Sequence, residues 1–212
     1  MDVLWRSTGF AADVLEVFDR SLTDKELVSQ SKTLCKDYII SRLNQNGFGW
    51  SKADLNFSSN ASVCEVSVVL LCLGDELECI QPSLYRNVAQ QLNISVAMEN
   101  MVSDAFYGVA TEIFSTGITW GKVVAMYAVA GALAVDCVKQ GHVNNVHVIV
   151  DSLGQFVRKY LVHWLKRRGG WMEITKCVVR KDFIPENHWV SSVIDSLKYF
   201  LTSIYVYIMK ES

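Results

Sequence analysis

The sequence predicts an all-α fold: a single-domain helical bundle with a central hydrophobic hairpin, amphipathic helices around it and a C-terminal tail-anchor helix. Three observations support this class. The 212 residues include only two prolines and twelve glycines, half of all residues are hydrophobic, and residues 123–135 carry no charge. A chain of this length can bury one sizeable core. We expect the bundle to span residues 1–187 and the membrane anchor to span residues 188–212.

The first helices are defined by capping signals and by apolar spacing. Residues 10–18 form a short amphipathic segment. Thr23 and Glu26 match a capping box, which satisfies backbone N–H groups at a helix start. The helix that follows has a core face made by Leu27, Leu34, Tyr38 and Ile39. Residues 44–60 are polar and contain two glycines, so we expect a loop there.

A second capping box, Ser62 with Glu65, is expected to begin the next helix. Within it, Gly74 and Asp75 interrupt an apolar stripe at its middle. A helical glycine costs about 1 kcal/mol relative to alanine, so we expect another backbone to approach closely there. Asp75 offers a carboxylate to a cationic partner. The stripe, which we call the docking stripe, consists of Val66, Leu70, Leu73, Leu77 and Ile80.

Two interpretations of this helix remain open at this point. An apolar ridge with one small residue and one charge is typical of a helix that docks in a groove. It is also compatible with an ordinary core helix that tolerates a glycine. Pro82 should end the helix near Gln81, and residues 83–92 are expected to form a short helix. The helix after that has a core face of Val102, Phe106, Val109 and Ile113 and ends by Gly117.

The central hairpin begins at Thr119, which we expect to act as an N-cap. The uncharged run 123–135 is hydrophobic on all sides and shorter than the ~18–20 residues that a lone membrane span needs, so we place it in the core. After a turn at 141–145, a partner helix carries Val146, Ile149, Val150, Leu153, Val157, Leu161 and Trp164. Gly169 and Gly170 should end it, and Trp171 should begin a short last helix.

The C-terminal segment 189–209 is about 30 Å long as a helix, close to the thickness of a bilayer core. Asp195 and Lys198 lie within it, and their insertion cost roughly offsets the gain from its apolar residues. We predict a marginal tail anchor; an amphipathic helix packed on the bundle is the alternative. The anchor residues are Trp189, Val193, Leu197, Phe200, Leu201, Ile204 and Ile208.

The composition argues against several classes of function. A net charge of −2 does not suit a nucleic-acid binder, which needs a basic surface. The six cysteines form no C-x-x-C pair, and no secretory signal is evident, so we expect reduced and mostly buried thiols. The four histidines are scattered. We expect no metal and no cofactor, and nothing supports an enzyme, since no phosphate loop, nucleophile elbow or convincing acid/base pair is present.

Four segments resemble, in their order along the chain, the homology motifs of the B-cell lymphoma 2 (Bcl) family of apoptosis regulators. In the third motif a leucine, a small residue and an aspartate recur, and Leu70, Gly74 and Asp75 take these places. The resemblance extends over nearly the whole chain. The segments are 25–43 for the fourth motif, 66–80 for the third, 112–131 for the first and 164–179 for the second.

The resemblance implies a surface groove that receives a helix like 66–80 from another molecule. Where the family has Asn-Trp-Gly-Arg, this chain ends its run with Lys122, which lacks the two-pronged geometry that arginine offers a carboxylate. We therefore expect the groove to capture another molecule's docking helix more weakly or less selectively. Core packing is the competing interpretation for the tryptophans. The implied groove residues are Thr119, Trp120, Gly121, Lys122, Val123, Tyr127, Trp164, Gly169, Gly170 and Trp171.

Two functions are compatible with the resemblance. One is a pro-apoptotic effector that oligomerises in the mitochondrial outer membrane, permeabilises it by helix-in-groove exchange and hairpin insertion, and releases cytochrome c. The other is an anti-apoptotic guardian that sequesters docking helices. Expected partners are the chain itself, other Bcl family proteins and lipid membranes, but not nucleic acid. We expect it in the cytoplasm and, tail-anchored, on mitochondria, endoplasmic reticulum and Golgi.

A basic segment adds one more open question. Lys166, Arg167 and Arg168 follow one another, with Arg158 and Lys159 one or two turns earlier. They form either a solvated face or a surface attracted to anionic lipid headgroups.

Overall fold

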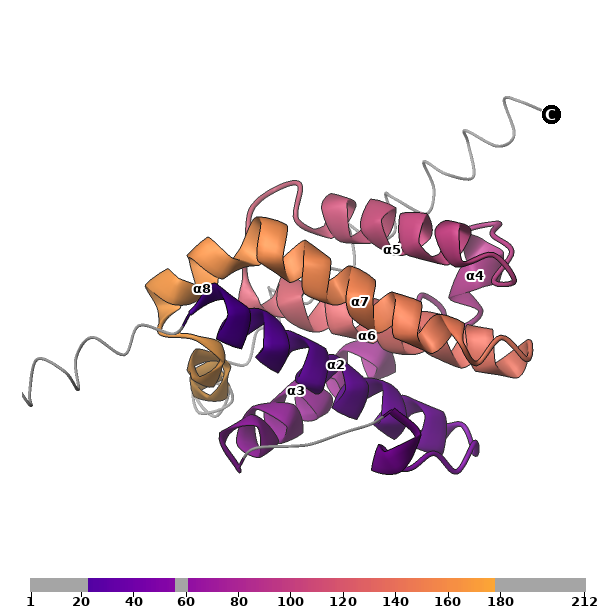
Figure 1. Ribbon diagram of the computed structural model, residues 1–212, viewed down its shortest axis with the longest axis horizontal. Helices are drawn as coiled ribbons and strands as arrows, with labels where there is room; N and C mark the ends of the chain where they lie inside the picture. Colours follow the sequence, from indigo (N-terminus) through magenta and orange to yellow (C-terminus); the bar gives the residue numbers. More distant parts are fainter. Residues whose placement is uncertain (1–22, 56–60, 178–212) are drawn as a thin grey trace, which may run out of the picture.

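A computed structural model describes residues 23–55 and 61–177 of the chain. The described part is an all-α bundle built around one buried apolar helix, as predicted (Figure 1). The predicted segments 10–18 and 189–209 lie outside the described residues. The elements are α2 (Asp24–Gln45), η1 (Lys52–Leu55), α3 (Ala61–Ile80), α4 (Val88–Gln91), α5 (Glu99–Ile113), α6 (Trp120–Lys139), α7 (Asn145–Phe156), η2 (Val157–Leu161), α8 (Val162–Arg168) and η3 (Trp171–Ile174).

Helix α6 is the centre of the bundle, with α2, α3, α4, α5 and α7 packed around it. Thr119 caps it, since its hydroxyl oxygen accepts the Lys122 N–H at 3.3 Å. Every residue from Lys122 to Cys137 is buried. Within the described part of the chain, α6 is the one helix long and apolar enough to cross a membrane, and nearly all of its apolar stretch is buried inside the bundle. The prediction of a core helix is confirmed.

The two predicted capping boxes have different outcomes. At the start of α2, Thr23 and Glu26 bond each other reciprocally: the Glu26 N–H donates to the Thr23 hydroxyl at 3.2 Å, and the Thr23 N–H donates to the Glu26 carboxylate at 2.8 Å. The second prediction is wrong. Helix α3 already begins at Ala61, so Ser62 lies inside the helix, where a residue cannot act as the N-cap.

Several predicted boundaries hold. Helix α3 ends at Ile80, before Pro82, and α5 ends at Ile113, with Gly117 in the loop that follows. Other boundaries shift: α2 continues to Gln45, into the predicted loop, and only Val88–Gln91 of the segment 83–92 is helical.

The partner helix of the hairpin contains an irregularity that periodicity did not predict. Between α7 and α8, residues Val157–Leu161 form a π-turn. The wider turn adds one residue, so Phe156 and Val157 on one side of it and Leu161 and Val162 on the other are all buried. Gly169 and Gly170, at φ of 90° and 85°, then end α8 in a conformation that favours glycine.

The expectation of mostly buried cysteines is wrong for the residues on α3. Cys35 and Cys137 are buried, but Cys64, Cys72 and Cys79 are exposed, and Cys177 is half-buried. The three α3 cysteines lie on one face of the helix, because their spacings of eight and seven residues are close to two helical turns. This face is exposed and lies opposite the buried apolar stripe.

A carboxylate of α6 holds the start of the short helix α4. Asp136 is buried and accepts the Ala89 N–H at 2.9 Å, while Asn87, the residue before α4, makes no side-chain cap. Burial raises the pKa of the Asp136 carboxyl, and the Ala89 N–H opposes this rise. The connection 81–98 between α3 and α5 is thereby tied to the central helix.

The raised pKa of Asp136 predicts that the stability of the fold depends on pH. Because its pKa is raised in the folded state, its contribution to stability is fully present below the unfolded pKa and is lost as pH rises through the folded value. We expect Asp136→Asn, which keeps an acceptor for Ala89, to remove this dependence. The free energy of unfolding of the native chain, relative to that of the variant, should rise in urea titrations as the pH falls from neutrality through the folded pKa of Asp136 toward that of an unfolded aspartate. A constant difference would contradict the prediction.

Candidate docking site on helix α3

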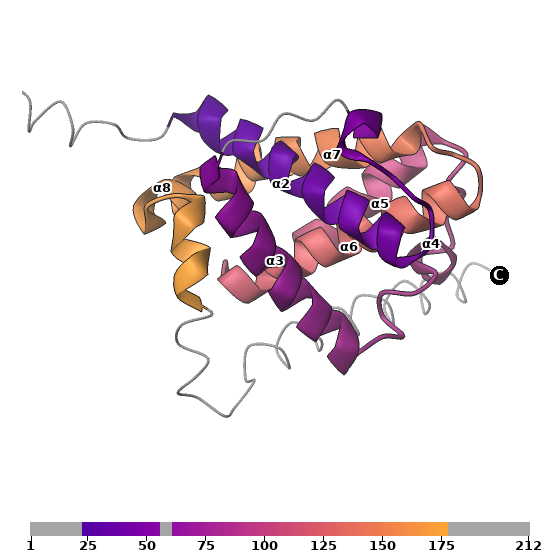
Figure 2. The same ribbon diagram turned by 90° about the horizontal axis from the view of Figure 1, so that it is seen from below.

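Helix α3 lies along the lower side of the bundle against α2, α6 and η3 (Figure 2). Four members of the docking stripe, Val66, Leu70, Leu73 and Leu77, are buried in this interface. Ile80 is not: it is 39% exposed. It is the last residue of α3, where the chain turns away toward Pro82, and the stripe is therefore one residue shorter than the sequence pattern indicated.

Gly74 is required by a side chain rather than by the backbone that we expected. A Cβ atom added to Gly74 would lie 2.1 Å from the Tyr38 hydroxyl oxygen and 2.8 Å from two carbons of its ring. A Cβ added to Gly131 of α6 would come within 2.9 Å of the other edge of the same ring. The Tyr38 ring of α2 therefore fits between two glycines, one on α3 and one on α6.

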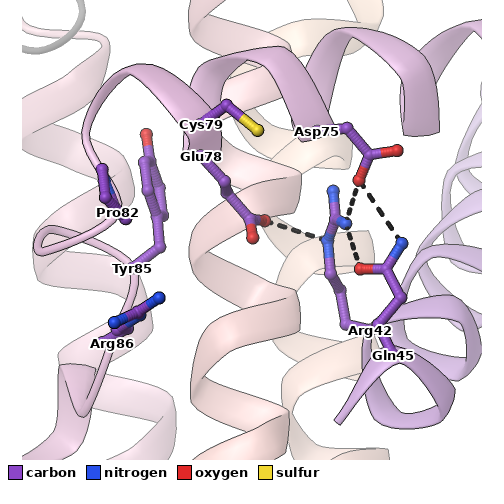
Figure 3. Close-up of a pocket in the computed structure, with 8 residues that line it drawn as sticks. All are labelled: Arg42, Gln45, Asp75, Glu78, Cys79, Pro82, Tyr85 and Arg86. Carbon is purple, nitrogen blue, oxygen red and sulfur yellow. Dashed lines mark hydrogen bonds and ion pairs between the residues drawn. The ribbon is translucent and has the colours of Figure 1, made fainter.

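Arg42 of α2 is the cationic partner of Asp75. Its guanidinium forms an ion pair with Asp75 and a second one with Glu78, whose Oε1 lies 2.9 Å from Nε (Figure 3). Arg42 also donates to the Tyr38 hydroxyl oxygen at 2.7 Å, and that hydroxyl donates to Glu78 at 3.2 Å. We call Tyr38, Arg42, Asp75 and Glu78 the Arg42 cluster. It ties α3 to α2 at the point where the stripe is interrupted.

The two carboxylates of the Arg42 cluster have different environments. The Arg42 side chain is only 4% exposed, the Glu78 side chain is 26% exposed, and the Asp75 side chain is 51% exposed. Burial raises the pKa of Glu78, and the Arg42 charge opposes this rise. A buried guanidinium needs its partners because an uncompensated buried charge is strongly destabilising. Solvent and other molecules can reach Asp75, so the cluster is open to competition at this carboxylate.

Cavities flank α3 near both of its ends. One, of about 420 Å³, lies beside the Arg42 cluster and contains the buried Tyr85 hydroxyl, which has no hydrogen-bond partner among the described residues. Its lining is Arg42, Gln45, Asp75, Glu78, Cys79, Pro82, Tyr85 and Arg86. The other, of about 230 Å³, is lined by Gln30, Leu34, Val63, Val66, Gly169, Trp171 and Met172. Both cavities are partly open to solvent, so the ends of α3 that line them can be reached from the surface.

The tryptophans predicted for the groove form one aromatic cluster. Ring centroids of Trp120 and Trp164 are 4.8 Å apart, and those of Trp120 and Trp171 are 6.2 Å apart. Trp164 and Trp171 are buried, and the Trp171 indole N–H donates to the Leu27 carbonyl at 3.0 Å. Trp120 is half-buried. Core packing therefore accounts for two of the three, as the competing interpretation held.

Other predicted groove residues are divided between the core and the surface. Val123 and Tyr127 are fully buried, and the Tyr127 hydroxyl donates to the Ser31 carbonyl at 3.2 Å. Thr119 is exposed and Gly121 is half-buried.

Lys122 is the most informative of the predicted groove residues. It is only 4% exposed, and its ammonium donates to the Thr116 hydroxyl at 2.6 Å and to the Gly117 carbonyl at 3.1 Å. Burial lowers its pKa. No carboxylate pairs with it among the described residues. The charge that would receive an incoming aspartate is thus held by the loop before α6.

Comparison with known proteins places this arrangement in a family. Residues 70–171 match the apoptosis regulator proteins of the Bcl-2 family. The chain is 56% identical to Bcl-2-related ovarian killer protein homolog A of Danio rerio, with all of both chains covered. The crystal structure of chicken BOK matches with a TM-score of 0.67 and 60% identity, covering 74% of this chain and 99% of that one.

A more distant structure, Trichoplax adhaerens trBcl-2L2 bound to trBak BH3, matches with a TM-score of 0.64 and 27% identity, covering 71% of this chain and 98% of that one. The buried apolar helix α6, the order of the four motifs and the full-length identity agree. The chain belongs to the Bcl-2 family of apoptosis regulators, which are not enzymes, and within it to the Bcl-2-related ovarian killer proteins.

Proposed function

We propose that this chain is a pro-apoptotic effector that oligomerises in the mitochondrial outer membrane and permeabilises it, releasing cytochrome c. Helix α3 is the docking helix, and a second copy of the chain supplies the groove that receives it. The hairpin of α6 and α7 then enters the membrane, for which α6 has the length and the apolar character.

The observation that carries this proposal is the state of the two docking surfaces. Four stripe residues of α3 face inward, Asp75 is paired with Arg42 of the same chain, and Lys122 is buried against its own loop. A guardian needs an accessible groove with an available cation, because it depends on tight capture. A latent effector instead needs its docking helix closed until activation. These contacts support a latent effector over a guardian.

The proposed exchange follows from these contacts. A competitor at the exposed Asp75, or a spontaneous opening, separates α3 from Arg42. The stripe becomes available to a second copy, whose Thr116–Lys122 contact must also open to present the ammonium. Two closed contacts thus oppose activation, and loss of either raises the population of the open state.

The test is cytochrome c release from isolated mitochondria that lack other effectors. The purified full-length chain is added alone and then with a helical peptide of the docking type. Release establishes an effector. Absence of release in both conditions, together with protection when a separate effector is added, contradicts the proposal and supports the guardian, the second candidate.

The proposed location is the cytosolic face of the mitochondrial outer membrane, the endoplasmic reticulum and the Golgi, with residues 188–212 as anchor. We expect deletion of residues 189–212 to move most of the chain from the membrane fraction to the soluble fraction, because the rest of the bundle keeps its apolar helix buried. Carbonate-washed membranes measure this, and a full-length variant with Ile204→Lys should reproduce part of the shift. Unchanged retention of the truncated chain would show that another surface does the anchoring.

A further inference from the structure

A cationic face lies at the end of the bundle formed by η2 and α8. From Ser152 to Met172 the chain contains no aspartate or glutamate. The basic residues of this stretch are all exposed: Arg158, Lys159, His163, Lys166, Arg167 and Arg168. Since the whole chain has a net charge of −2, the residues outside this stretch have a net negative formal charge, while this stretch is positive.

The π-turn shapes this face. Val157 and Leu161 are buried at its two ends, so the three residues between them, Arg158, Lys159 and Tyr160, all point outward. A regular helix would turn one of three successive residues toward the core. His163 and Arg167 then follow Lys159 at intervals of four residues and continue the exposed row along α8. We call Arg158, Lys159, Tyr160, His163 and Arg167 the η2–α8 face.

Of the basic side chains between Ser152 and Met172, those on the η2–α8 face form no ion pair with a described residue, whereas two others have partners. Lys166 pairs with Asp24 at 2.5 Å, and the Arg168 guanidinium lies 5.3 Å from the centre of the Trp164 ring, so these two have partners. By contrast, Arg158, His163 and Arg167 make no ion pair with any residue that the structure describes. The Lys159 ammonium lies 5.0 Å from the centre of the neighbouring Tyr160 ring and interacts with the Tyr160 and Tyr107 side chains, but it forms no ion pair among the described residues.

Tyr160 gives the face an aromatic element. It is 43% exposed and its ring lies against Phe156, with centroids 4.7 Å apart. A tyrosine that packs one part of its ring on the protein and exposes the rest suits the headgroup level of a membrane, where such amphipathic rings concentrate.

We propose that the η2–α8 face binds anionic lipid headgroups and docks the folded chain on the membrane before any helix inserts. This deepens the proposed function by naming the lipid class and the surface. A chain with net negative charge is repelled by an anionic membrane unless it presents a local cationic face. The η2–α8 face continues directly from α7, the second helix of the hairpin, so docking here brings the hairpin close to the bilayer.

The test measures binding of the full-length chain to phosphatidylcholine vesicles with and without phosphatidylserine. Each Lys or Arg near an anionic surface contributes about fivefold in affinity. We expect Lys159→Gln to weaken binding to the anionic vesicles about fivefold and Lys159→Gln with Arg167→Gln about 25-fold. Binding to neutral vesicles, which reports on other anchoring, should not change, and high salt should abolish the difference.

Lys139→Gln is the matched control, because Lys139 is an exposed cation at the C-terminal end of α6, near α4 and far from α8 in both views (Figures 1 and 2). It should leave the affinity for both kinds of vesicle nearly unchanged. Equal losses for Lys139→Gln and Lys159→Gln would overturn the proposal in favour of a general charge effect, and no loss for the double variant would show a solvated face only.

The experiment distinguishes a failure of the lipid-docking proposal from a failure of the proposed effector function. Vesicle binding needs no permeabilisation, and dye release is recorded in the same samples. Charge-dependent binding through this face, with no dye release either from the chain alone or after addition of a helical peptide of the docking type, would support the docking surface and contradict the effector function. Dye release with no dependence on Lys159 and Arg167 would contradict the docking surface alone.

Discussion

Replacement of Arg42 by methionine is expected to increase cytochrome c release in the absence of any trigger by more than about tenfold, while lowering the free energy of unfolding by about 2–3 kcal/mol. Methionine fills most of the space of the arginine side chain but leaves Glu78 and Asp75 without their counter-charge. The cost lies below the range for fully buried pairs because Asp75 can be hydrated at its half-exposed position. Release from isolated mitochondria and urea unfolding give the two numbers.

A general loss of stability could raise activity without any role for the Arg42 cluster, so a matched control is needed. Leu153→Ala in α7 removes a fully buried side chain at a site that does not pack on α3, and it should cost a similar 2–5 kcal/mol. We expect it to increase release much less than Arg42→Met does. Equal increases in both variants would show that stability alone controls activation.

A second substitution separates the charge from the packing. Adding Glu78→Met to Arg42→Met removes the half-buried carboxylate that the first change leaves unpaired, and apolar replacement of a buried ion pair is often neutral or stabilising. The double variant should recover at least half of the lost stability. It should also recover part of the latency if the unpaired Glu78 charge drives α3 away from α2. No recovery of either quantity would place the effect of Arg42 in its bond to Tyr38.

The sequence predicted the features that depend on residues close together along the chain. Helix α6 was predictable because thirteen successive uncharged residues need burial on all sides. The caps at Thr23 and Thr119 and the stop before Pro82 depend only on neighbouring residues. The sequence also predicted a cationic partner for Asp75, because its carboxylate lies beside an apolar stripe.

The features that the sequence did not predict depend on which helices pack against one another. That Arg42 is the cation, and that the Tyr38 ring fills the space over Gly74, follows from the packing of α2 on α3, which no local pattern encodes. Lys122 was predicted as a groove cation from its position in a motif, but the Thr116 and Gly117 acceptors that bury it lie in an irregular loop. The π-turn had no signal because the extra residue preserves the apolar spacing on either side.

Replacement of Leu73 by glutamate is expected to change release in the opposite direction and abolish it. Leu73 is 5% exposed in the α3 interface, so a carboxylate there destabilises the closed form, as Arg42→Met does. Unlike Arg42→Met, it also ruins the apolar stripe that a second copy must bind. Loss of release together with loss of cross-linked oligomers on the membrane, despite a weakened closed form, is what the exchange mechanism requires.

The matched control for this substitution lies on the same helix. Val68 is 63% exposed on the opposite face of α3, so Val68→Glu adds the same charge without entering the interface and should retain release near the level of the native chain. Should Leu73→Glu fail to fold by circular dichroism, Leu73→Ala replaces it: it shortens the stripe at a cost of about 2–5 kcal/mol in the closed form and should still reduce release at least about tenfold. Release at or above the native level from a folded Leu73 variant would refute exchange of α3 between copies, because no mechanism that depends on this stripe tolerates its central leucine being lost.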